Sequence, residues 1–206
     1  MKKGWRVELN EIVARYTDAL DQFGEDMAYT VTIPDSGVLT VEDAVRRMGY
    51  TAADLQGPDE LPHTDDSISL HRVGAGIVTL DENVPTPERR QVTDRLGGEG
   101  FRHWHVAFDI NGYTSMHVRY GATVGDLEGP EPASIPFTPW TELLGPLSAY
   151  IDLFTRCYNS EEADASVDIV AACLAAVEAE SGIRLDPELM RSPAPALSLP
   201  NPDYVE

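Results

Sequence analysis

Apolar side chains recur every three or four positions in several parts of the chain, the spacing that places them on one face of a helix. Thr40, Thr86 and Asp164 precede three of these stretches and are expected to act as N-caps, because their side-chain oxygens can accept a backbone N–H at a helix start. A shorter helical stretch is expected from Pro139. The full pattern predicts helices over residues 5–23, 41–48, 87–96, 146–158 and 164–182.

Short runs rich in β-branched and aromatic residues predict strands over residues 27–33, 67–73, 76–80, 101–110 and 113–118. Asn111-Gly112 separates the last two runs and predicts a two-residue hairpin turn, because both residues tolerate a positive φ. In that register residue 106 pairs with His117. His117 is then expected on the opposite sheet face from His103 and His105.

Strands that precede a group of helices are typical of an α+β fold. We therefore expect an antiparallel sheet with helices packed on one face. Residues 1–190 are expected to form a single acidic domain with a Gly/Pro-rich loop at 125–139. Residues 191–206 are expected to be a Pro-rich C-terminal tail, because they lack a helix or strand pattern.

The net charge restricts the classes of partner. The chain has 35 acidic and 15 basic residues, a formal net charge of −20. Such a surface repels phosphate backbones and anionic lipids, so we expect no direct binding of nucleic acid and no membrane binding. The N-terminus does not resemble a signal peptide, and Cys157 and Cys173 do not suggest a disulfide framework. A cytoplasmic location is therefore expected.

Three segments resemble an actinobacterial domain family of unknown function. They are Phe108 to Gly112 with the strand that follows, Ala176 to Leu189, and Thr40 to Gly49. The resemblance covers about residues 25–190 and implies a bacterial protein of a conflict or specialised-metabolism locus. The chain departs from the family at His71 to Gly74, where an aromatic-rich strand is expected. The family has no assigned catalytic residues, so the resemblance implies none here.

His103-Trp104-His105 is the strongest candidate for chemistry. Residues at i and i+2 of a strand share a face, which is how several β-proteins present two imidazoles to one metal ion. Asp109 adds a carboxylate to the same predicted face. With Gly97, this spacing resembles the first half of a cupin metal motif, although aspartate replaces glutamate and the second half is missing. His103, His105 and Asp109 are thus the candidate ligands of a divalent metal ion, and the alternative interpretation is that His103 and His105 lie on a partly solvated sheet face or contact a partner.

The sequence carries no Gly-x-Ser-x-Gly elbow and no phosphate loop, and it leaves open whether the protein is an enzyme. The first hypothesis is a non-catalytic acidic interaction protein, an immunity, adaptor or regulatory module, because acidic surfaces steer towards basic protein partners. A mimic of DNA is a weaker variant, since the acids are dispersed among caps and loops. The alternative is a metal-dependent enzyme or small-ligand-binding domain centred on His103 and His105.

Overall fold

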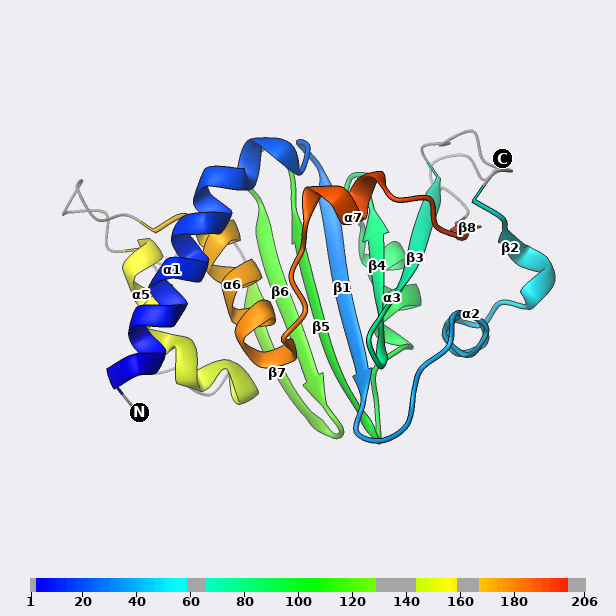
Figure 1. Ribbon diagram of the computed structural model, residues 1–206, viewed down its shortest axis with the longest axis horizontal. Helices are drawn as coiled ribbons and strands as arrows, with labels where there is room; N and C mark the ends of the chain where they lie inside the picture. Colours follow the sequence, from blue (N-terminus) through cyan, green and yellow to red (C-terminus); the bar gives the residue numbers. More distant parts are fainter. Residues whose placement is uncertain (1–2, 59–65, 129–143, 159–166, 200–206) are drawn as a thin grey trace.

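The computed structural model describes residues 3–58, 66–128, 144–158 and 167–199 (Figure 1). Within them, one antiparallel sheet has eight strands in the order β2-β8-β3-β4-β1-β5-β6-β7. The strands are β1 (Met27–Pro34), β2 (Leu55–Gln56), β3 (Ser67–Val73), β4 (Gly76–Asp81), β5 (Phe101–Phe108), β6 (Thr114–Tyr120), β7 (Thr123–Glu128) and β8 (Ala196–Ser198). The α-helices are α1 (Lys3–Ala19), α2 (Val41–Met48), α3 (Pro87–Asp94), α5 (Ile151–Tyr158), α6 (Ile169–Ser181) and α7 (Pro187–Arg191). Short 3₁₀ helices are η1 (Leu20–Gln22), η2 (Ala52–Asp54) and η4 (Gly145–Tyr150).

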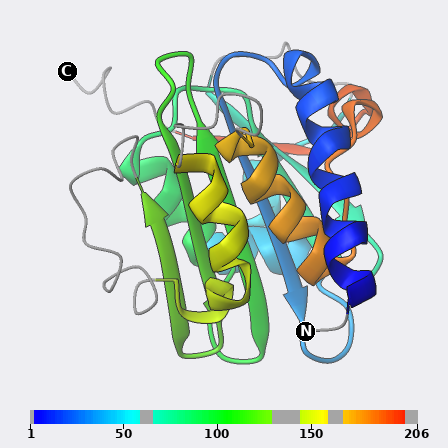
Figure 2. The same cartoon turned by 90° about the vertical axis from the view of Figure 1, so that its left-hand side faces the viewer.

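Helices α1, α5 and α6 cover one face of the sheet. Figure 2 shows α5, α6 and α1 side by side over β1, β5 and β6. Alternate strand residues, including Val31 of β1 and Trp104 of β5, point into the large apolar core beneath these helices. Helix α6 lies between α1 and α5 and packs on the sheet, and its residues from Ala171 to Val177 are all buried. This layer contains most of the apolar core.

Helices α2 and α3 lie on the opposite face, so the helical cover is not confined to one side. A second apolar cluster includes Val45 and Met48 of α2 together with Ile77 of β4. Strand β1 reflects this double cover, because its residues from Met27 to Thr32 are all buried rather than alternately exposed. The α+β class and the antiparallel sheet are confirmed. The additional layer on the second face encloses the candidate histidines.

The predicted caps of two helices are present. Thr40 accepts the backbone N–H of Asp43 at the start of α2, and Thr86 accepts that of Arg89 at the start of α3. Helix α6 begins later than expected: its N-cap is Asp168, whose side chain accepts the N–H of Ala171. Asp164 lies outside the described residues, as does the helical stretch expected from Pro139.

Three strands were not predicted from the sequence: β2, β7 and β8. Strand β7 includes Gly125 and pairs with β6 along its length, although the pattern predicts a loop from residue 125. The remainder of that predicted loop lies outside the described residues after Glu128. Gly125 is required there because a Cβ at this position would lie 2.2 Å from the carbonyl oxygen of Leu144, just before η4. The missing side chain lets η4 pack directly against β7.

Residues 191–206 were expected to be a tail without helix or strand, and this prediction is wrong for the part that forms β8. Strand β8 inserts between β2 and β3, and Leu197 and Leu199 are buried in the second apolar cluster. Pro195 stays outside the strand, and its carbonyl accepts the backbone N–H of Leu70. A strand of three residues between prolines is too short for an alternating pattern to reveal. Among the described residues, no helix combines the length and apolar character needed to cross a membrane.

Candidate functional site

His103 and His105 do share one face of β5, as predicted. That face is closed by α3, and each histidine has a relative exposure of 2%. Two threonines on the neighbouring strand β1 contact the imidazoles: Thr32 Oγ1 lies 2.8 Å from His103 Nδ1, and Thr30 Oγ1 lies 3.0 Å from His105 Nδ1. The alternative interpretation of a partly solvated face is therefore wrong, because α3 covers it.

His117 lies on the same face as His103 and His105, and the prediction of the opposite face was wrong. His105 pairs directly with His117, and their ring centroids are 6.1 Å apart. The connection between β5 and β6 spans five residues, 109–113, rather than the two of Asn111-Gly112. This changes the pairing register by one residue, and a one-residue change moves a side chain to the other face.

Asp109 lies in the turn beyond the end of β5. Its Oδ1 accepts the backbone N–H groups of Asn111 and Tyr113, at 2.8 and 3.0 Å. The carboxylate therefore stabilises the hairpin loop, as aspartate often does in turns. Among the described residues, no group of three or more His, Cys, Asp or Glu side chains could hold a metal ion. A site at His103, His105 and Asp109 stays a prediction without a geometric basis in this structure.

Polar side chains of α3 and β7 enclose the histidines. Asp126 accepts a hydrogen bond from His117 Nδ1, and Arg90 Nη1 lies 2.5 Å from His117 Nε2. A carboxylate can only accept here, so Nδ1 carries the hydrogen, and Nε2 faces the guanidinium. On the other side, His103 Nε2 lies 3.6 Å from Asp94 Oδ1, too far for a hydrogen bond. Burial is the largest single influence on the pKa of Asp94 and raises it, but His103, His105 and Arg90 together outweigh burial, so the net shift is downward.

His105 lies deepest in the cluster. Burial lowers its pKa most, and the neighbouring imidazoles of His103 and His117 lower it further, to about 3. His105 is therefore neutral at pH 7 and keeps its hydrogen bond to Thr30 in that form.

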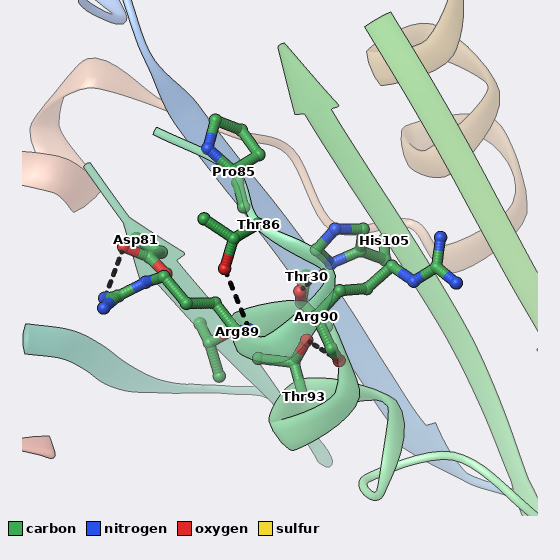
Figure 3. A pocket seen from close by; sticks show the side chains of 10 residues that line it. Thr30, Asp81, Pro85, Thr86, Arg89, Arg90, Thr93 and His105 are labelled. Carbon is green, nitrogen blue, oxygen red and sulfur yellow. Dashed lines mark hydrogen bonds and ion pairs between the residues drawn. The ribbon is translucent and has the colours of Figure 1, made fainter. Parts of the chain in front are cut away.

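A small cavity lies between His105 and α3, and Figure 3 shows its lining. Its volume is about 10 Å³, roughly the room that one water molecule needs. At its edge Arg89 and Asp81 form a buried ion pair with two hydrogen bonds of 2.7 and 2.9 Å. The cavity has no room for an organic substrate beside His105. The three histidines thus form a buried polar layer between α3 and the sheet.

A different surface concentrates charge. Glu8, Glu11, Asp18, Asp21 and Glu25 are all exposed on the solvent side of α1 and η1 and the turn after it. Their spacing places them opposite Leu9, Val13 and Tyr16, which point into the core. The described basic side chain within this stretch is Arg15, and Glu178 of α6 already binds it. We call these five carboxylates the α1 acidic face.

The α1 acidic face was missed in the sequence, where the acids were interpreted as dispersed. The helical spacing of the acidic residues carries this signal, but only the apolar residues were assigned to a helix face. Comparisons with protein-family models, curated proteins and solved structures found no match for this chain. The resemblance to an actinobacterial family therefore stays an expectation.

Proposed function

We propose that this protein is an interaction module, of the immunity, adaptor or regulatory kind, that binds a basic protein. The α1 acidic face is the observation that carries the proposal. It presents five exposed carboxylates between Glu8 and Glu25, on α1, η1 and the turn after it. The helical part from Glu8 to Asp18 spans about 15 Å at the usual rise per residue.

Two of the described basic side chains at α1 already have partners of their own. Arg15 is turned towards Glu178, and Arg156 of α5 donates to the side-chain oxygen of Asn10. Successive carboxylates of α1 lie about 5 to 10 Å apart along the helix axis, comparable with the Debye length of about 8 Å at physiological salt, so the potentials of neighbouring acids reinforce one another. Such a negative face raises the association rate with a cationic surface and disfavours acidic partners. Docking of this kind requires no catalysis.

The rigidity of the α1 acidic face also supports the proposal. Leu9, Val13 and Tyr16 anchor α1 in the main core, and the hydroxyl of Tyr16 accepts the backbone N–H of Leu185. The acids are therefore held in fixed positions by the buried side of the same helix. A preorganised surface loses less conformational freedom when it binds a partner.

The experiment compares two variants with the same loss of charge. One carries E11Q, D18N and D21N on α1. The control carries E42Q, E88Q and E99Q, three exposed acids outside α1. Each is immobilised next to the unchanged protein, and proteins retained from the native cell extract are quantified by mass spectrometry.

The proposal predicts a basic protein that binds the unchanged protein and the control variant, and that the α1 variant loses. Elution of that protein should shift to higher salt in step with the number of α1 acids retained. Equal retention by both variants would place the binding elsewhere. Retained proteins without an excess of basic residues would contradict the proposed partner class.

A further inference from the structure

A second polar cluster lies on the sheet face that carries α1 and α6, far along the sheet towards β8. Ser67, Ser69 and His71 alternate on β3 and therefore share this face. After α7 the chain runs over the same face to reach β8 (Figure 1). Ser192, the residue after α7, is thereby brought to His71. A cavity of about 300 Å³ lies over these side chains, close to the lower end of small-molecule sites.

The hydrogen bonds define which atoms of Ser192, His71 and Ser69 donate and which accept. Ser192 Oγ donates to the carbonyl oxygen of Leu189 at 2.7 Å, so towards His71 it can only accept. Nδ1 of His71, 3.3 Å away, must therefore carry the hydrogen. Nε2 is then the acceptor, and Ser69 Oγ lies 3.1 Å from it. The carbonyl of Leu80 is a more distant acceptor for Ser69, at 3.4 Å.

Burial lowers the pKa of His71, so the imidazole is neutral at pH 7 and able to accept a proton. A serine bonded to an imidazole that a third group orients is the arrangement that activates a nucleophile. We propose that Ser69 is such a nucleophile, with His71 as its general base, and that the cavity takes a small carboxylic ester. Ser192 is a positioning residue, because it acts on His71 and not on the ester.

In the reaction, Ser69 Oγ forms a bond to the ester carbonyl carbon while its proton passes to His71 Nε2. The bond from that carbon to the alkoxy oxygen then breaks, and Nε2 gives the proton to the departing alcohol. Water, deprotonated by the same nitrogen, cleaves the acyl-serine and restores the hydroxyl, so ester and water give acid and alcohol. Arg191 in the cavity wall supplies positive charge near the carbonyl oxygen, and Glu82 lies in the same wall.

This activity is independent of the proposed docking function, because α1 contributes no residue to the cavity lining. The test treats the full chain with a fluorophosphonate probe and maps the labelled residue by peptide mass spectrometry. Hydrolysis of p-nitrophenyl acetate is measured in parallel. The proposal predicts labelling at Ser69 and a loss of hydrolysis of at least a hundredfold in Ser69→Ala. Ser67→Ala, on the same strand face, is the matched control and should keep both.

Ser192→Ala tests the positioning role. It should lower kcat about tenfold with KM unchanged. It should also move the acid limb of the pH–rate profile, because that limb reports the protonation of His71, which Glu82 and Arg191 in the cavity wall also influence. The proposal is overturned if the unchanged protein shows no label at Ser69, or if Ser69→Ala hydrolyses the ester at the original rate. The labelling result on the unchanged protein does not depend on whether any variant folds.

Discussion

The burial of His105 makes the stability of the fold depend on pH in a way that can be calculated. The ordinary pKa of 6.5 applies in the unfolded chain, whereas the folded value is about 3. Between these values the unfolded chain binds a proton that the folded protein does not. Stability is therefore complete above pH 6.5 and falls as the pH drops towards 3. At pH 5 the loss from this residue is about 2 kcal/mol, at 1.36 kcal/mol per pKa unit.

The perturbation that isolates this effect is His105→Gln, which removes the titrating group and keeps a polar side chain beside Thr30. The free energy of unfolding is measured by urea denaturation at pH 7.5, 6.5, 5.5 and 5.0 for both proteins. The pKa of Asp94 is lowered, so its carboxylate stays ionised throughout this range and its contribution to the free energy of unfolding does not change there. His71, whose pKa is also lowered, is present in both proteins and cancels in the comparison.

We expect the unchanged protein to lose about 2 kcal/mol more than His105→Gln between pH 7.5 and pH 5.0. Absolute stabilities will differ because the substitution also changes packing, but the difference in slope reports the proton alone. Parallel curves for the two proteins would refute the reasoning. They would show that His105 has a similar pKa in the folded and unfolded states, and hence that α3 does not shield it from water.

Three further predictions concern stability and are all measured by urea denaturation at pH 7.5. Leu197→Ala should cost about 2–5 kcal/mol, because this fully buried side chain of β8 would leave a cavity; an unchanged midpoint would mean that β8 does not pair in solution. Arg89→Met should cost about 3–5 kcal/mol by leaving the carboxylate of Asp81 buried without its cation, and adding Asp81→Asn should recover part of it. If the double variant is no more stable than the single one, the ion pair is not the cause. Asp168→Ala should cost about 1 kcal/mol, because it removes the capping bond at the start of α6, and no loss would exclude that cap.

Local signals in the sequence predicted local structure well. Thr40 and Thr86 cap helices as expected, because a cap depends on residues three positions apart. The shared face of His103 and His105 follows from the two-residue period of a strand in the same way. These features need no knowledge of the rest of the fold, and they were predictable from a few neighbouring residues.

Features set by distant parts of the chain were not predictable. The sheet face on which His117 lies depends on the length of the hairpin loop. Asn111-Gly112 suggested a two-residue loop, whereas Asp109 stabilises a longer one. The insertion of β8 depends on a gap between β2 and β3 that sequence periodicity does not encode. The contact between His71 and Ser192 joins residues 121 positions apart. Ser69 and His71 could have been selected as a pair on one strand face, but the third member came from the segment assigned to the tail.

The central claim, that the α1 acidic face binds a basic protein, is tested most directly by calorimetric titration of the captured partner. The dissociation constant is measured for the unchanged protein and the E11Q, D18N, D21N variant, each at low and at high salt. We expect the variant to bind at least tenfold more weakly at low salt, with a smaller dependence on salt. Equal affinity and equal salt dependence for the two proteins would contradict the claim.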